Sequence, residues 1–114
     1  MKYALLAYSE GEGRAEPGPR PMPPGIAAVL ERPEVTGYMR LDPPGSAATV
    51  RPDAGATLAT DGPFVDSKEY LGGLILVEAG SLDQALAIAA ELQDLGLTSA
   101  IEVRPVFEQE LGGD

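Results

Sequence analysis

Residues 61–77 read DGPFVDSKEYLGGLILV, a turn sequence that leads directly into an apolar segment. The chain from Leu71 to Glu78 is apolar on both faces of an extended strand, which is typical of a position inside a sheet. We therefore predict the central strand of the fold here. Gly72 and Gly73 lack the following lysine and serine of a phosphate-binding loop, so they predict a bulge or a close approach between strands.

The first four residues of this stretch predict a rigid turn. Asp61 can accept backbone N–H bonds as an Asx turn, Gly62 permits positive φ, and Pro63 fixes φ. Phe64 is expected to fill the core beneath the turn. These roles explain the four residues by structure alone, and a functional role for Asp61 is a separate hypothesis.

Hydrophobic periodicity and turn residues predict the remaining elements. The predicted strands are 2–8, 35–41, 48–51, 57–60 and 98–107, and the predicted helices are 25–32 and 82–95. The strands at 48–51 and 57–60 flank the turn sequence PDAG and form an inserted hairpin. The order β-α-β, hairpin, β-α-β corresponds to an α+β ferredoxin-like sandwich, with an antiparallel sheet and both helices on one face.

The helix at 82–95 has clear signals at both ends. Ser81 and Gln84 stand at the spacing of a capping box, and Gly96 suits a left-handed C-terminal cap. The expected buried stripe of this helix consists of Leu82, Ala85, Leu86, Ala89 and Leu92.

The composition limits both size and partners. The 114 residues predict one domain, with a Pro/Gly-rich loop at 9–24 and an acidic tail at 108–114. Eighteen acidic and eight basic residues give a net charge of −10. Because nucleic acids and anionic membranes attract clustered cations, we predict binding to neither, while a basic partner or a cationic small molecule stays open. No signal segment is recognisable, which predicts a cytoplasmic protein.

The chain contains no cysteine and no histidine. A disulfide, a thiolate nucleophile and an imidazole base are therefore excluded. The acidic residues do not follow the spacing of a calcium loop, so we predict no metal site and no cofactor.

Two sets of side chains are candidates for a functional site. In the first set, Asp61 is the candidate catalytic residue, and Asp66, Lys68 and Glu69 are candidate ligand-binding residues. A carboxylate beside a lysine can position a proton or bind a polar ligand. The structural alternative is that these residues only build the turn and the start of the strand.

The second set contains Tyr38 and Arg40, together with Tyr8. Tyr38 and Arg40 alternate on one face of the predicted strand at 35–41, so both can reach one cleft. As one of few cations, Arg40 is the natural anchor for a carboxylate ligand. The alternative is that these side chains lie along a sheet edge, with their polar ends in water.

The motifs DGPF and DSKEYLGG, followed by an apolar strand, resemble the signature of the DGPF-domain, YCII-related family. Residues 99–106, SAIEVRPV, are similar to the usual ending of that family, and residues 1–6, MKYALL, resemble its first strand. The resemblance covers residues 2–8 and 35–108. It implies a dimeric α+β barrel, in which two sheets pack face to face.

The pattern of the chain itself also predicts a homodimer. Helices on one face of the sheet leave the other apolar face exposed, and a second copy is the expected cover. In one respect the chain departs from the family, whose members usually carry a substantial helix across residues 9–24. It also lacks the histidine of the His-Asp pair in the YCII branch, so any reaction would have to use Asp, Glu, Lys or Tyr.

These observations leave three hypotheses for function. The first is a homodimeric protein that binds a small polar metabolite in a cleft at the dimer seam. The second is an acid–base enzyme built on Asp61 and Lys68. The third is a regulatory protein–protein module, which the resemblance suggests because such domains are often associated with extracytoplasmic-function sigma factors.

Overall fold

A four-stranded antiparallel sheet lies at the centre of the computed structural model, which describes residues 1–10 and 18–110. Its strand order is β2-β5-β1-β6. The strands are β1 (Lys2–Glu10), β2 (Val35–Arg40), β5 (Glu69–Glu78) and β6 (Ala100–Pro105). The interior strands β1 and β5 are those whose sequences are apolar on both faces, as predicted for the strand at 71–78.

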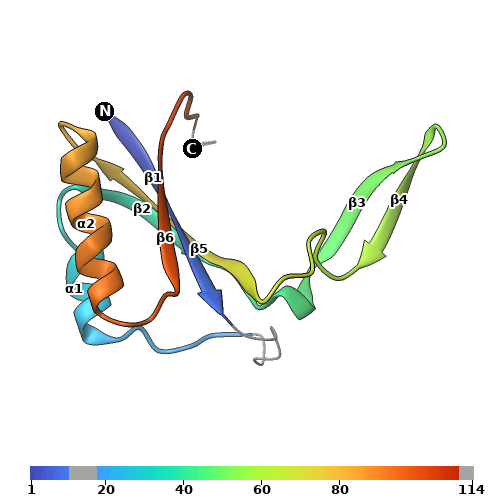
Figure 1. Cartoon of the computed structure of the whole chain (residues 1–114), viewed down its shortest axis with the longest axis horizontal. Helices are drawn as coiled ribbons and strands as arrows, with labels where there is room; N and C mark the ends of the chain where they lie inside the picture. Colours follow the sequence, from blue (N-terminus) through green and yellow to red (C-terminus); the bar gives the residue numbers. More distant parts are fainter. Residues whose placement is uncertain (11–17, 111–114) are drawn as a thin grey trace.

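The helices α1 (Pro24–Leu30) and α2 (Leu82–Asp94) both lie on one face of this sheet (Figure 1). The buried core lies between them and the sheet. Its residues are Tyr3, Leu5, Val29, Val77, Ala79, Ala85, Ile88, Ala89 and Leu92. The predicted α+β ferredoxin-like fold is confirmed. Across the described parts of the chain, no helix has the length and apolar character needed to cross a membrane.

Strand register decides which side chains face the helices. Leu5 lies opposite Ile75 on β5 and Val103 on β6, and it is fully buried. Because side chains alternate along a strand, Leu6 and its partner Leu74 point to the other side of the sheet. This second side, the open face, carries the partly exposed residues Ala4, Leu6, Tyr8, Leu74 and Leu76.

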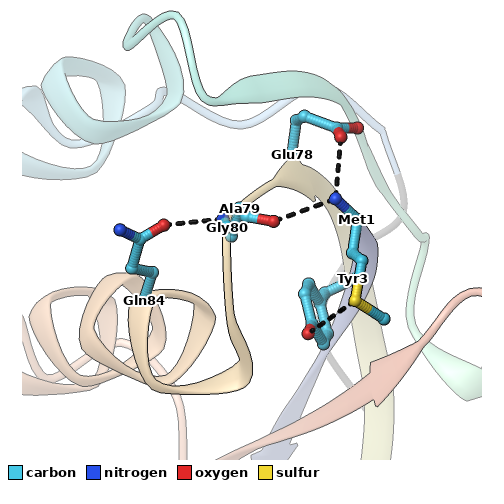
Figure 2. A network of polar contacts seen from close by, with 6 residues as sticks. All are labelled: Met1, Tyr3, Glu78, Ala79, Gly80 and Gln84. Carbon is cyan, nitrogen blue, oxygen red and sulfur yellow. Dashed lines mark hydrogen bonds and ion pairs between the residues drawn. The ribbon is translucent and has the colours of Figure 1, made fainter.

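Helix α2 has the predicted caps. Ser81 Oγ accepts a hydrogen bond from the Gln84 backbone N–H at 3.2 Å. The N–H of Gly80 donates to Gln84 Oε1 at 2.6 Å (Figure 2). In a standard capping box the second bond comes from the N–H of the N-cap residue, which is Ser81. Here it comes from the N–H of Gly80, one residue earlier. Gly96 has a φ of 81°, which is the expected left-handed cap.

The predicted buried stripe of α2 is partly wrong. Ile88 is buried, whereas Leu82 and Leu86 are exposed; the other three predicted residues are buried. A helix turns about 100° per residue, so Ala85, Ile88, Ala89 and Leu92 share one stripe that faces the sheet. Leu82 and Leu86 lie beside this stripe, on the side away from Ile88.

The first residue of the chain joins β1 to the end of β5. The Met1 ammonium donates to Glu78 Oε1 and to the Ala79 carbonyl oxygen, each at 3.0 Å (Figure 2). The Tyr3 hydroxyl lies 3.7 Å from Met1 Sδ. These contacts lie directly before the cap of α2 and close that end of the sheet.

An ion pair links the two helices. Arg32, which follows α1, binds the Glu91 carboxylate of α2 through both terminal guanidinium nitrogens. This hydrogen bonding lowers the pKa of the Glu91 carboxyl group. Because both side chains are exposed, the pair contributes little to the stability of the fold.

The predicted inserted hairpin consists of β3 (Ala48–Asp53) and β4 (Ala56–Asp61), preceded by the 3₁₀ turn η1 (Pro44–Ser46). Ala54 and Gly55 connect the strands with φ of 47° and 85°, as in a type I′ turn. Among the described strands, β3 and β4 pair only with each other, and they project away from the four-stranded sheet (Figure 1).

The two glycines of β5 have the predicted roles. The β1–β5 register shifts between Ala7 and Tyr8, which leaves Gly72 as the extra residue of a bulge. A Cβ on Gly73 would lie 3.0 Å from the carbonyl oxygen of Met39, so β2 can approach this closely only beside a glycine.

The structure describes part of the predicted loop at 9–24, namely residues 9–10 and 18–24. Ser9 and Glu10 belong to β1, which is longer than predicted, and Pro24 begins α1. Residues 18–23 form neither helix nor strand. The predicted loop residues 11–17 and tail residues 111–114 lie outside the described residues.

Candidate functional site

A cavity of about 560 Å³ lies between the helices and the sheet. Apolar side chains from several elements form much of its wall, among them Ile26 and Leu30 on α1, Leu92 on α2, Ile75 on β5 and Ile101 on β6. Its volume falls within the range of about 300–1,000 Å³ that is usual for small-molecule sites.

Tyr38 and Arg40 of β2 line this cavity. In the β2–β5 register, Tyr38 lies opposite Ile75 and Arg40 lies opposite Gly73, so both side chains are on the helix-facing side. The structure thus brings these two predicted residues to one site.

A segment before α1 closes the cavity next to Arg40. Arg40 Nη1 donates to the Arg20 carbonyl oxygen at 2.8 Å, and the Gly18 N–H donates to Asp42 Oδ1 at 2.9 Å. These two bonds hold residues 18–20 against the end of β2. Arg20, Arg40 and Asp42 also line an adjoining hollow of about 300 Å³.

The cavity differs in charge from the rest of the protein. Its described lining residues include Arg20 and Arg40 but no aspartate or glutamate. In the whole sequence, eighteen acids outnumber eight bases. The described wall is therefore a local cationic site in an acidic chain.

The other predicted set lies elsewhere in the fold. Asp61 ends β4, Asp66 and Lys68 follow in the connection to β5, and Glu69 begins β5. All four residues are exposed, and none of these four lines the cavity. Their role at a seam between two copies stays a prediction. Within the described residues, no group of three or more acids is arranged to hold a metal ion.

The DGPF turn is built differently from the prediction. Gly62 has the expected positive φ of 97°, its N–H donates to the Ala47 carbonyl oxygen at 2.7 Å, and its carbonyl oxygen accepts from Thr49 Oγ1 at 2.8 Å. Among the described residues, the Asp61 carboxylate accepts no hydrogen bond, so the predicted Asx turn is not formed.

The predicted burial of Phe64 is wrong for the single chain. Its side chain is 69% exposed and lies beside Arg51 of the hairpin, with the guanidinium carbon 6.0 Å from the ring centroid. The turn stands at the base of the projecting hairpin rather than above the core, which is why the ring cannot reach the core.

We expect Asp61→Ala to change the free energy of unfolding by less than about 0.5 kcal/mol, because the carboxylate is exposed and accepts no hydrogen bond from the described residues. Gly62→Ala is the control in the same turn. It should cost about 1 kcal/mol, because alanine is strained at a φ of 97°. Urea unfolding followed by circular dichroism measures both. An equal loss for the two variants would show that Asp61 does tie the turn.

Several polar residues of the cavity were not predicted from the sequence, namely Ser9, Arg20, Tyr70 and Thr98. Alternation counted back from Ile75 places Leu71, not Tyr70, on the helix-facing side. The bulge at Gly72 reverses that alternation and turns Tyr70 toward the cavity. A glycine pair inside a strand is the signal that could have revealed this change. Arg20 lies in an irregular segment, for which periodicity carries no information.

The comparisons with known proteins agree with the resemblance in the motifs. Residues 1–110 match the YCII-related domain. An uncharacterized protein of Rhizobium meliloti (strain 1021) is 46% identical over 115 residues, an alignment that covers 93% of this chain and 92% of that protein. The chain belongs to the YCII-related domain family.

Proposed function

We propose that the protein binds a small amphipathic organic anion in the cavity between the helices and the sheet. The observation that carries the proposal is the position of Arg40, whose cationic side chain lines a largely apolar cavity of about 560 Å³. The apolar part of the ligand lies among Ile26, Leu30 and Ile75, and its carboxylate binds at Arg40.

The chemistry of the wall supports an anion over a neutral or cationic ligand. A guanidinium group offers a planar pair of donors that matches a carboxylate, and such charge-assisted bonds are the strong ones. Tyr38 and Tyr70 line the same cavity and add hydroxyl groups that can donate to the ligand. The polar groups are few and the apolar wall is large, which is the usual composition of a ligand site.

We also propose that the protein is a homodimer that assembles through the open face. Leu6, Leu74 and Leu76 give this face an apolar centre, and a second copy would remove them from water. The cavity lies on the opposite, helix-covered side of the sheet. Ligand binding and dimerisation therefore involve largely different surfaces, with Leu74 beside both, and can be tested separately. No arrangement among the described residues favours the acid–base enzyme or the regulatory module over a binding protein.

We expect Arg40→Gln to weaken the binding of decanoate, a simple amphipathic carboxylate, by about tenfold or more. Hydrogen bonds to a charged group contribute about 1.5–3 kcal/mol, and 1.4 kcal/mol corresponds to tenfold in affinity. Isothermal titration calorimetry on the parent and the variant gives both dissociation constants. Decanol, which has the same chain without the charge, should bind the two proteins equally.

Arg51→Gln is the matched control, because Arg51 lies on the hairpin and does not line the cavity. It should leave the dissociation constant of decanoate unchanged. The proposal is wrong if neither decanoate nor decanol binds the parent, or if the two arginine variants lose decanoate affinity to the same extent.

A further inference from the structure

The projecting hairpin has little support from its own chain. We call residues 48–65 the arm, which comprises β3, β4 and the DGPF turn with Val65. Apart from Thr49, every residue of the two strands is exposed. A two-stranded hairpin without further packing is at best marginally stable in water. The arm therefore has a well-defined shape, and the described residues of the chain do not supply the packing that would hold that shape.

The arm carries large apolar side chains on both of its faces. Val50 lies opposite Ala59 on one face, and Leu58 lies opposite Arg51 on the other. Phe64 stacks beside Arg51 and extends the second face. Val50 is 66% exposed and Phe64 is 69% exposed in the single chain, so an unfilled contact surface remains on the arm.

The position of the arm indicates where its partner lies. In Figure 1 the helices lie on one side of the sheet and the arm extends on the other, past the open face. Each strand of the arm has six residues, which at about 3.3 Å per residue span about 20 Å. Packed sheets lie about 10 Å apart, so an arm of this length reaches a second sheet placed on the open face and extends beyond it.

We propose that the arm docks on a second copy of the chain that is seated on the open face, with the two arms exchanged between the copies. The inference rests on the proposed homodimer and adds a second contact to it. Four strands about 4.8 Å apart and about 20 Å long outline a face of about 400 Å². A standard interface removes about 800 Å² from each partner, so the arms supply a large part of the contact area.

The charge pattern favours a second copy over a basic protein partner. Arg51, Asp53 and Asp61 are the charged residues among the eighteen of the arm, although the whole chain has a net charge of −10. On the open face, Arg104 pairs with Glu102 of the same strand. Two copies of an acidic protein repel each other least through such nearly neutral surfaces, whereas a basic partner would be attracted to the acidic surfaces elsewhere.

Substitutions on the arm test this contact. We expect Val50→Lys and Phe64→Ser each to raise the dissociation constant of the dimer by about tenfold or more, measured by sedimentation velocity over a dilution series. Phe107→Ser is the matched control, because Phe107 is 98% exposed and lies outside the arm. It should leave the dissociation constant unchanged. Circular dichroism of each variant checks that the four-stranded sheet and helices are retained.

Hydrogen exchange provides a readout that needs no substitution. Amides of β3 and β4 should exchange more slowly in the dimer than in a sample diluted below the dissociation constant. A parent that stays monomeric at micromolar concentration overturns both the arm contact and the homodimer. A dimeric parent that tolerates both arm substitutions, with arm amides that exchange equally in both samples, overturns the arm contact alone. Neither result changes the decanoate titration, because the residues that bind decanoate belong to one chain.

Discussion

Leu5→Ala is expected to lower the free energy of unfolding by about 2–5 kcal/mol, which is a large part of the stability of a domain of this size. Leu5 is fully buried, on an interior strand, between Ile75 and Val103 of the flanking strands. Truncation removes favourable burial and leaves a cavity that neighbouring strands cannot close, because their hydrogen bonds fix their spacing. Urea unfolding followed by circular dichroism measures the change.

Leu6→Ala is the matched control for this prediction. It is the same substitution one residue later, on a side chain that is partly exposed on the open face. In a sample dilute enough to hold separate chains, the loss should be below about 1 kcal/mol. The sample must be dilute because dimer formation would raise the measured free energy of unfolding. Equal losses for Leu5 and Leu6 would mean that the assignment of the two sheet faces is wrong.

The elements of the fold were predictable because their signals are local. A strand inside a sheet needs apolar residues on both faces, and residues 71–78 show this over one continuous run. The ends of α2 are set by Ser81, Gln84 and Gly96, which act within a few residues of where they stand. Such signals predict elements without knowledge of what packs against them.

Burial was less predictable than secondary structure. Leu82, Leu86 and Phe64 are large apolar residues, and each was expected inside. Apolar character does not require burial, because there is too little polar surface to cover a protein of this size. The position of Phe64 depends on where the hairpin points, and no pattern within the hairpin sequence determines that direction. Side chains that are exposed in one chain are also the ones available for contact with another.

The site was predictable to the extent that it follows strand alternation. Tyr38 and Arg40 stand two residues apart on β2, and that spacing places both on one side of the sheet. The conspicuous DGPF block identified the family, but its Asp61 lies outside the cavity. A role for Asp61 at a seam between two copies stays a prediction, because that role would depend on a second chain. The cavity itself depends on the packing of α1 against β2 and β5, which is a tertiary property.

The proposed homodimer leads to the last prediction. We expect the parent chain to have about twice its mass of 11.8 kDa by light scattering at micromolar concentration, and Leu76→Lys to be a monomer. Leu76 lies on interior strand β5, opposite Ala4 and Gly37, whose small size leaves it prominent on the open face. In a single chain the lysine can extend into water. Between two packed sheets it would be a buried charge without a partner in each copy, which costs several kcal/mol.

Leu86→Lys makes the same chemical change on the exposed flank of α2, on the other side of the sheet, and should remain a dimer. Both substitutions change the net charge of −10 by the same amount. A difference between the two variants in oligomeric state must therefore come from the position of the new charge. If Leu76→Lys stays dimeric, the open face is not the interface. If Leu86→Lys is the one that dissociates, the helices rather than the sheets form the contact. Because the cavity lies beneath the helices, that second outcome would also bring the partner next to the ligand site.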